Sequence, residues 1–505
     1  MNLVRTLARS SARRSATPAT LGQPHTFRHC SIRTQAQAFS AAPVRTQHYV
    51  DAAQLQFGQP VHETHPHLLQ RGELTPGITA QEYHDRRIAL CSRLPKGSVV
   101  LVEAATLKWA SNSIFYPHRQ DINFLYLTGF LEDTAVAAIE KPSDDPEDFV
   151  FHLFVHPKDP AQEQWAGPRS GVVAARDVWN ADAAYDFADL SLRLPQILKS
   201  ASRIYADVQK PKPGHPGTHL HALLRDGACT DASSQARGKL HALSPILDEI
   251  RMVKSPAEIA NMRRAGRDAG RGISNLMRYE WLFEHDVAAA LEHDVKRAGC
   301  TGLSFIPVVG GGRNGSCVHY VHNNAAIPRG SLLLVDAGAE YGGYVSDITR
   351  VWPQNGKFTA AQRDLYEALL TVQRKCVSLC REDAGLSLND IHREARTGLM
   401  AELERLGFPS GGHGYIDKLF NHHVGHHVGM DVHDCMSASR SAPLKKGNCV
   451  TIEPGVYVPD DSRFPAHFHG MGMRIEDSVA VDEDSVINLT VEAVKEVADI
   501  EALRQ

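Results

Sequence analysis

The sequence lacks several features that would assign it to a specialised class of proteins. None of its nine cysteines forms a CxxC pair, and their number is ordinary for 505 residues, so a reducing compartment fits. No run of about 18 apolar residues occurs, which argues against a membrane span. No internal repeat or low-complexity tract is present. The hydrophobic share of 43% is enough to bury large cores, and the length indicates two or more domains.

The first fifty residues contain no acidic residue and no lysine, but they contain seven arginines. Arg5, Arg9 and Arg13 recur every four residues, as in a basic amphipathic helix. We therefore predict that residues 1–50 are a mitochondrial transit peptide and that the protein lies in the matrix or peripherally on the inner membrane. The alternative is a basic arm that binds nucleic acid or acidic lipid. Without this segment the formal charge changes from −4 to −11, and such an acidic body has no electrostatic reason to bind nucleic acid.

The rest of the chain is predicted to contain a linker and two domains. Residues 51–73 are polar and rich in His and Gln, as a linker would be, and a Pro-Gly turn signal follows them. Residues 74–246 alternate between strand-like and helical segments, which predicts an α/β domain. The segments expected to be strands here are 98–104, 123–130, 135–139 and 149–155. Those expected to be helices are 81–94, 174–179, 190–200 and 219–224.

The pattern changes near residue 247, and we predict a second domain over 247–505. Ser255 and Glu258 flank Pro256 in a strong helix-start signal. The helices expected here are 255–277, 283–298, 360–382 and 388–406. The segments expected to be strands are 302–309, 317–321, 331–352, 447–458 and 473–488. Helices that flank a largely antiparallel sheet make this domain, and the fold class of the chain, α+β.

Two carboxylates are expected on neighbouring strands of the second domain. The apolar run from Leu332 to Val335 predicts a buried strand that ends at Asp336. Asp347 follows after a glycine-rich turn, on a second β-prone segment. Because side chains alternate along strands, both carboxylates can point to one place in the interior. Buried carboxylates are costly unless a cation neutralises them, so the pair indicates a metal site. From this stretch alone, two aspartates at turn ends are an equal alternative.

Three further clusters occur in the same domain. They are the histidine-rich run 422–434 (HHVGHHVGMDVHD), Glu453 at the end of an apolar strand, and Glu476 within a strand. Taken singly, each fits a structural or solvated residue. Four carboxylates and a histidine in one domain, on strands or turns with glycines nearby, favour a common site.

Five segments in order resemble the successive motifs of the pita-bread metallopeptidases, and more narrowly those of the aminopeptidase P branch. They are CVHYVHN, LLLVDAGAEYGGYVSDITRVWP, HHVGHHVGMDVHD, TIEPGVYV and GMGMRIED. RQDINFLYLTGF (119–130) is similar to the creatinase-like N-terminal domain of that branch. ELTPGITAQEY, FVFHLFVHPKDP and QWAGPRSG look closer still to its mitochondrial intermediate-cleaving members and their animal counterparts. The resemblance implies an α/β creatinase-like domain followed by a pita-bread catalytic domain.

The resemblance also implies the site residues. The implied metal ligands are Asp336, Asp347, His426, Glu453 and Glu476. The family pattern places the histidine ligand three residues before the glycine of GMDVHD, which selects His426 over His427. The implied supporting residues are His319, His422, His433 and Arg474. His423 and His427 are then bystanders.

This ligand set is rich in hard oxygen donors and suits two divalent ions, with manganese expected. Asp347 and Glu476 would bridge the ions, Asp336 would hold one of them, and His426 with Glu453 the other. A shared water would attack the first peptide carbonyl, and Glu453 would carry the proton to the leaving nitrogen. His433 and His319 would donate to the oxyanion, and Arg474 would orient the carboxylates.

The implied activity is removal of a single N-terminal residue from imported mitochondrial proteins after presequence cleavage. The implied partners are those N-termini or peptides, and a second copy of the chain in a homodimer or larger homo-oligomer. One alternative is an Xaa-Pro aminopeptidase that acts on free peptides with proline second. Another is an inactive pita-bread module that binds peptides, but such relatives typically lose metal ligands.

Overall fold

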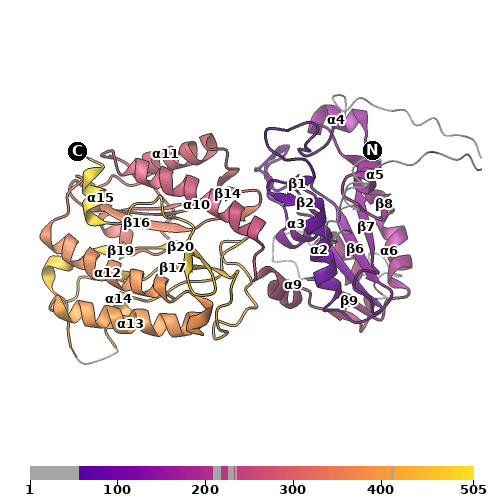
Figure 1. Ribbon diagram of the computed structural model, residues 1–505. Helices are drawn as coiled ribbons and strands as arrows, with labels where there is room; N and C mark the ends of the chain where they lie inside the picture. The colour runs from indigo at the N-terminus through magenta and orange to yellow at the C-terminus, as the bar shows by residue number, and fades with distance from the viewer. Residues whose placement is uncertain (1–55, 209–217, 226–232, 234–235, 411–413, 505) are drawn as a thin grey trace, which may run out of the picture.

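The computed structural model describes residues 56–208, 218–225, 233, 236–410 and 414–504. It contains two lobes that lie side by side and are joined through α9 (Ser244–Arg251) (Figure 1). The transit peptide predicted over 1–50 lies outside the described residues. Within the described part of the chain, no helix is long and apolar enough to cross a membrane.

The N-terminal lobe is built on a mixed sheet with the strand order β10-β9-β3-β6-β7-β8. Its strands are β3 (Ser98–Glu103), β6 (Val136–Lys141), β7 (Val150–Val155), β8 (Ala183–Asp186), β9 (Arg203–Tyr205) and β10 (Leu240–His241). Its helices are α2 (Ala80–Cys91), α3 (Ile122–Thr128), α4 (Pro160–Ala166), α5 (Gly171–Asp177), α6 (Leu190–Leu198) and α7 (His219–Leu224). Two small hairpins complete the lobe, β1 (Glu73–Thr75) with β2 (Ile78–Thr79) and β4 (Trp109–Ser111) with β5 (Ile114–Phe115). The predicted α/β architecture is confirmed.

One predicted strand of this lobe is wrong. Segment 123–130 forms helix α3, which Asp121 caps by accepting a hydrogen bond from the Phe124 amide. Gly129 ends the helix with a φ of 67°, a conformation that favours glycine. Five consecutive residues of α3, from Phe124 to Thr128, are buried, so the segment shows neither strand nor helix periodicity. Asp121 and Gly129 mark the two ends of the helix in the sequence, although the apolar run between them resembles a strand.

The segment predicted as a linker packs on the N-terminal lobe over its described part. Val61 and Leu69 are buried, and the Gln59 amide donates to the Gly129 carbonyl at 3.1 Å. The Gln59 side-chain oxygen accepts a hydrogen bond from the Leu131 amide. Residues 56–73 are therefore an ordered layer over α3, although their composition is polar.

The C-terminal lobe combines short antiparallel strands with long helices. Its strands are β11 (Gly302–Leu303), β12 (Val308–Gly311), β13 (Leu332–Ala337), β14 (Ala339–Tyr341), β15 (Tyr344–Val345), β16 (Ile348–Pro353), β17 (Cys449–Ile452), β18 (Gly455–Tyr457), β19 (Gly472–Arg474), β20 (Asp477–Val481) and β21 (Val486–Asn488). Its helices are α10 (Pro256–Leu276), α11 (Glu284–Arg297), α12 (Ala360–Ser378), α13 (Leu388–Arg405), α14 (Ile416–Leu419) and α15 (Val497–Ala502). The pairings β12-β13-β16, β17-β20-β21, β18-β19 and β11-β14-β15 are antiparallel. The predicted α+β domain is confirmed, but 317–321 contains no strand and forms a turn and loop.

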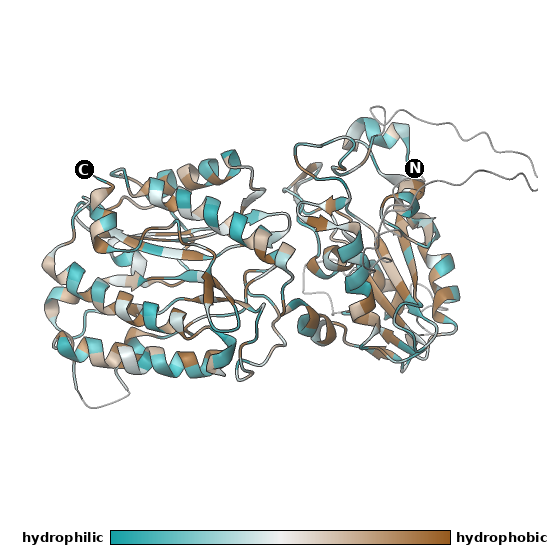
Figure 2. Ribbon diagram, in the orientation of Figure 1, coloured by the Kyte–Doolittle hydropathy of each residue, from teal (hydrophilic) through white to brown (hydrophobic). Residues whose placement is uncertain are grey.

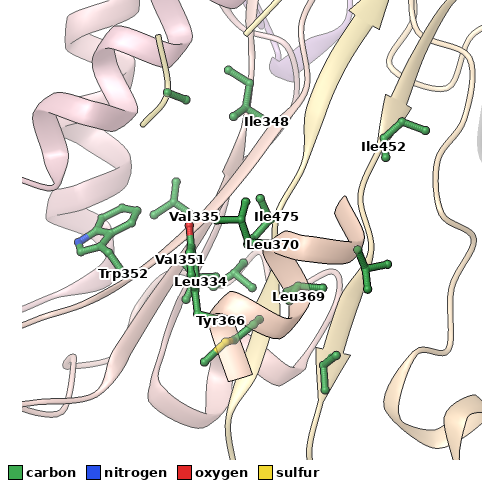
Figure 3. Packing of buried hydrophobic residues seen from close by; sticks show 14 of the residues in the cluster. Leu334, Val335, Ile348, Val351, Trp352, Tyr366, Leu369, Leu370, Ile452 and Ile475 are labelled. Carbon is green, nitrogen blue, oxygen red and sulfur yellow. The ribbon is translucent and has the colours of Figure 1, made fainter. Parts of the chain in front are cut away.

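The strands that carry the expected carboxylates lie in the core of this lobe. Figure 1 shows α10 and α11 above these strands and α12 and α13 below them. Leu334 and Val335 of β13 are buried together with Val351 of β16 and Leu369 of α12 (Figure 3). Hydrophobic residues concentrate in the strands of both lobes, whereas the outer helix faces are largely hydrophilic (Figure 2). The core therefore fixes the backbone on which the site is built.

The two lobes also share a hydrophobic cluster. Tyr344, Val345 and Val428 of the C-terminal lobe are buried in the same cluster as Phe124 and Leu125 of α3. A polar contact reinforces the junction, because the Arg86 guanidinium of α2 donates to the Tyr344 hydroxyl at 2.9 Å. The N-terminal lobe is thus packed directly against the strand that precedes Asp347.

Candidate metal centre and active site

Asp336 and Asp347 come from neighbouring antiparallel strands, as the alternation predicted. Asp336 pairs with Thr349 in the register of β13 and β16, and Asp347 directly precedes β16. The hydroxyl of Ser478 holds Asp347, because it accepts from the Asp347 amide and donates to its carbonyl at 2.8 Å. Between the two acids the chain passes so close to itself that a Cβ on Gly338 would lie 1.7 Å from the Ser346 carbonyl oxygen. A glycine is required there.

Glu453 and Glu476 are delivered by a second set of strands. β17 and β20 pair Ile452 with Asp477, so Glu453 and Glu476 lie side by side where these strands end. Glu476 is also tied to the first set, because its amide donates to the Thr349 carbonyl and its carboxylate accepts from the Thr349 hydroxyl at 2.6 Å. Four carboxylates therefore meet between two sheets.

His426 reaches the carboxylates from the loop between α14 and β17. Its amide donates to the Thr451 hydroxyl at 3.0 Å, and a Cβ on the preceding Gly425 would lie 1.8 Å from the Thr451 carbonyl oxygen. Nδ1 lies 3.0 Å from the His427 carbonyl, which assigns it as the donor. Nε2 is left with a free lone pair, 3.5 Å from Asp347 and 3.6 Å from Glu453. This is the tautomer that a metal-ligating imidazole needs.

The donor set fits a divalent cation. Among the described residues, Asp347, His426 and Glu476 offer ligand atoms that lie within 4.8 Å of one another. Oδ1 of Asp336 and Oδ1 of Asp347 are buried and have no hydrogen-bond partner in the part of the chain that the structure describes. Such unpaired buried oxygens are rare and costly, and metal coordination accounts for them.

The shifted pKa values of three of these carboxylates also indicate a site for a divalent cation. Burial, followed by repulsion from Asp336 and Glu453, raises the pKa of Asp347 well above its usual value. Burial, followed by repulsion from Asp347, does the same to the pKa of Glu476. The pKa of Glu453 is also raised, first by burial. The cluster holds more negative charge than its protein neighbours neutralise, so it favours a bound cation.

Arg474 supplies the positive charge that lies inside the cluster. Its guanidinium is buried and pairs with Asp336 at 2.6 Å. It also donates to the Thr349 hydroxyl at 2.9 Å and to the Tyr457 hydroxyl at 2.6 Å. Tyr457 in turn hydrogen-bonds to Nε2 of His422 at 2.9 Å. Arg474 therefore links carboxylates from both sets of strands to a supporting histidine.

The expected supporting histidines surround this cluster. Nδ1 of His422 lies 3.6 Å from Glu453, and burial together with Arg474 lowers the pKa of His422 to about 4. The rings of His433 and His426 are 4.4 Å apart. Burial, then His426 and His319, lower the pKa of His433, so His319 lies within electrostatic range of it. Both His319 and His433 are exposed in the single chain.

The two bystander histidines point elsewhere. His423 is exposed and contacts the ring of His392, at 5.6 Å between centroids. His427 is buried, and burial and Lys254 lower its pKa to about 4. Neither belongs to the group of ligand atoms, which is consistent with the selection of His426.

Three residues near the centre were not anticipated from the sequence. Thr349 and Tyr457 join the carboxylates, Arg474 and His422, as described above. Arg440 donates to the Gly425 carbonyl at 2.8 Å, and its positive charge partly opposes the rise in the pKa of Glu453 that burial causes. The position of Thr349 two residues after Asp347 is a usable signal, because residues two apart share a strand face. No pattern marks Tyr457 or Arg440.

Comparison with known proteins identifies the family. The model of metallopeptidase family M24 matches residues 260–483, and that of the aminopeptidase P N-terminal domain matches residues 83–205. Intermediate cleaving peptidase 55 of Saccharomyces cerevisiae is 41% identical over 457 residues, 89% of each chain. The chain belongs to the aminopeptidase P family. It is accordingly a metal-dependent aminopeptidase, with an N-terminal aminopeptidase P domain and a pita-bread catalytic domain.

Other relatives agree. Xaa-Pro aminopeptidase 3 of Homo sapiens is 37% identical and shares 88% of this chain and 90% of its own. The relative named mitochondrial intermediate cleaving peptidase 55 of Arabidopsis thaliana is 36% identical, over 88% of this chain and 87% of its own. The crystal structure of the yeast Icp55 matches with a TM-score of 0.79 and 39% identity, over 86% of this chain and 99% of that one. The aminopeptidase is mitochondrial, as its acid-free N-terminal segment predicted, and as an M24 metallopeptidase it uses divalent metal ions.

Proposed function

We propose that this aminopeptidase removes a single N-terminal residue from imported mitochondrial proteins after their presequences have been cleaved. Two observations support the proposal. The cluster of four carboxylates and His426 offers ligands for metal ions, with unpaired oxygens on Asp336 and Asp347. The chain is also 41% identical to a relative whose name describes cleavage of intermediates. Removal of that residue would expose the residue after it as the new N-terminus of each protein.

The five ligands are proposed to hold two divalent ions, with manganese favoured by the oxygen-rich donor set. Asp347 and Glu476, one from each set of strands, would hold the ions together with His426. Asp336 and Glu453 would complete the set of ligands. When bound, such a pair supplies an acidic water and positive charge opposite a developing oxyanion.

The protein groups around this pair have separable roles. Glu453, whose pKa is raised by burial, is suited to accept a proton and return it to the leaving nitrogen. His433 and His319 would donate hydrogen bonds to the substrate carbonyl as it becomes an oxyanion. His422 would hold the Tyr457 hydroxyl through Nε2 beside Glu453, and Arg474 would hold Asp336 in place.

A homodimer or larger homo-oligomer is part of the proposal. The β4–β5 hairpin exposes Trp109, Ile114, Phe115 and Tyr116 by 56–61%, and Trp165 on α4 is 90% exposed. Large exposed apolar side chains of this kind mark contact surfaces. His319 and His433 are also open to solvent, which leaves room for a second subunit to cover the site. The proposed domains are 74–246 and 247–505, after a transit peptide (1–50) and a connecting segment (51–73).

The test compares protein N-termini in mitochondria that contain the enzyme, lack it, or carry the Asp347→Asn variant. Mass spectrometry should find many proteins with one additional N-terminal residue in the latter two samples. Restoring the wild-type enzyme should remove that residue. Unchanged termini would refute the trimming role.

The second candidate function is cleavage of free peptides with proline in second position. The 37% identity to human Xaa-Pro aminopeptidase 3 favours it. Initial rates on a presequence-derived peptide and on a matched peptide with proline second would decide between the two. A strict requirement for proline would support this second function.

A further inference from the structure

Arg119 of the N-terminal domain makes polar contacts with the histidine loop, beside the hydrophobic contacts of Val428 and Met430. Arg119 lies in the chain between β5 and α3. Its Nη2 donates to the Met430 carbonyl at 2.6 Å, and its Nη1 to the Asp431 carboxylate at 3.2 Å. Its Nε donates to the Glu340 carboxylate of β14 at 2.8 Å. The planar guanidinium therefore hydrogen-bonds to the loop through two of its nitrogens and to β14 through the third.

The contacted loop, residues 426–434, carries both His426 and His433. The Asp434 amide donates to the His427 carbonyl at 2.9 Å and closes the base of the loop. Within the loop, the Gly429 amide donates to the Asp431 carbonyl at 3.0 Å. The loop has no regular secondary structure, so the position of His433 depends on contacts that hold the loop from outside.

Anchors lie on both sides of His433. On the following side, Asp434 is buried and pairs with Lys254 at 3.0 Å and with Arg251. Arg251 also donates to the Asn123 side chain of α3 at 2.8 Å. On the preceding side, Arg119 provides the contact described above. Without Arg119, residues 426–429 keep their backbone hydrogen bonds to the strands, among them those from the Val345 amide to the Gly429 carbonyl and from the Val428 amide to the Cys449 carbonyl. Residues 430–433 keep no backbone hydrogen bond to a strand in the described part of the chain.

The two anchors differ in what they contribute to the fold. The Asp434 group is buried, so breaking it would leave an unpaired charge and destabilise the protein. The Arg119 side chain is 44% exposed, and exposed ion pairs contribute little to stability. Its three hydrogen bonds instead restrict the orientation of residues 430 and 431. Arg119 can therefore be removed with little loss of stability while the loop gains freedom.

We propose that Arg119 is a positioning residue that acts across the domain junction and holds His433 in the orientation its hydrogen bond to the substrate requires. The inference rests on the proposed role of His433 as a donor to the oxyanion. It makes the N-terminal domain a functional part of the active site of its own subunit. A displacement of about 1 Å of such a donor can lower the rate about 100-fold.

The experiment measures kcat, KM and the melting temperature of the manganese-loaded enzyme on one peptide substrate. Arg119→Ala should lower kcat about 10- to 100-fold with little change in KM or melting temperature. Arg119→Lys keeps the charge but not the three-way geometry, and should recover only part of the loss. Arg193, an exposed arginine of the same domain that packs on the Tyr185 ring, is the matched control. Arg193→Ala should leave kcat unchanged.

A double variant separates this inference from the role of His433. His433→Ala should lower kcat, and adding Arg119→Ala to it should cause little further loss, because both changes remove the same interaction. If His433→Ala leaves kcat unchanged, the proposed role of His433 fails and the inference fails with it. If His433→Ala lowers kcat but Arg119→Ala does not, only the positioning role is overturned. Full additivity of the two losses would also overturn it.

Discussion

The carboxylate cluster predicts a reversal of stability between the wild type and Asp347→Asn. Without metal, Asp347 is buried beside other carboxylates, and its Oδ1 has no hydrogen-bond partner among the described residues. Asparagine has nearly the same volume, removes one charge from the cluster, and offers an amide that can donate to Asp336 or Glu476. We therefore expect the variant to be more stable than the wild type in chelator. With manganese the order should reverse, because the variant has lost a ligand.

The expected magnitudes are measurable. Removing one buried carboxylate oxygen that has no hydrogen-bond partner should raise the free energy of unfolding by about 1–3 kcal/mol. A ligand at 100 times its Kd stabilises the form that binds it by about 2.7 kcal/mol, and only the wild type should gain this in full. In a domain of this size, 1 kcal/mol shifts the melting temperature by about 2–4 °C. The two proteins should therefore differ by several degrees in opposite directions with and without manganese.

The pH dependence gives an independent measure of the same effect. The pKa values of Asp347, Glu453 and Glu476 are raised in the folded protein, so the folded metal-free form binds more protons than the unfolded chain. The contribution of these groups to the free energy of unfolding therefore decreases as pH rises above about 4. This decrease should be smaller in Asp347→Asn.

Scanning calorimetry from pH 5 to pH 8, with chelator or with manganese, is the assay. A wild type that remains more stable than Asp347→Asn in chelator would refute the reasoning, since the cluster would then be neutralised without a cation. Equal stabilisation of both proteins by manganese would refute the assignment of Asp347 as a ligand.

Two further predictions concern residues that hold the ligands. Arg474→Met leaves Asp336 without its cation and should weaken manganese binding about 10- to 100-fold by titration calorimetry, with a parallel loss of kcat/KM. Unchanged manganese affinity would contradict this role. Gly425→Ala places a Cβ 1.8 Å from the Thr451 carbonyl and should destabilise the fold by more than about 3 kcal/mol in chemical denaturation. Gly302→Ala, whose Cβ would meet only Lys296 at 3.6 Å, is its control and should stay near the wild type.

The carboxylate part of the site was predictable because strands carry it. Apolar runs identified β13 and β17, and alternation placed Asp336 and Asp347 on one side of adjacent strands. The proposed histidine ligand was not predictable from the residues alone, since four histidines lie within six positions. The structure distinguishes two of them physically. His426 turns Nε2 toward the carboxylates, whereas His427 is buried next to Lys254.

Contacts between distant parts of the chain had no local signal. Arg119 and Asp431 are separated by 312 residues, and each looks like an ordinary surface charge in the sequence. Tyr457 occupies a strand position that fits a plain core aromatic, yet it joins Arg474 to His422. Helix α3 was misassigned because burial on several faces removes periodicity, which is the property from which secondary structure is inferred.

The carboxylates and the histidines of the proposed site are held in place in different ways, and this difference makes both domains part of one site. The carboxylates stand on paired strands, whose hydrogen bonds and buried faces fix them within the catalytic domain. The histidines stand on loops: His426 is still hydrogen-bonded to Thr451 of β17, whereas His433 lies on a part of its loop that has no such pairing among the described residues. The loop that carries His433 is held on one side by the buried Asp434 group and on the other by Arg119 from the N-terminal domain. We therefore expect a catalytic domain released from its N-terminal partner to keep its carboxylate cluster but to lose the orientation of His433, the proposed oxyanion donor.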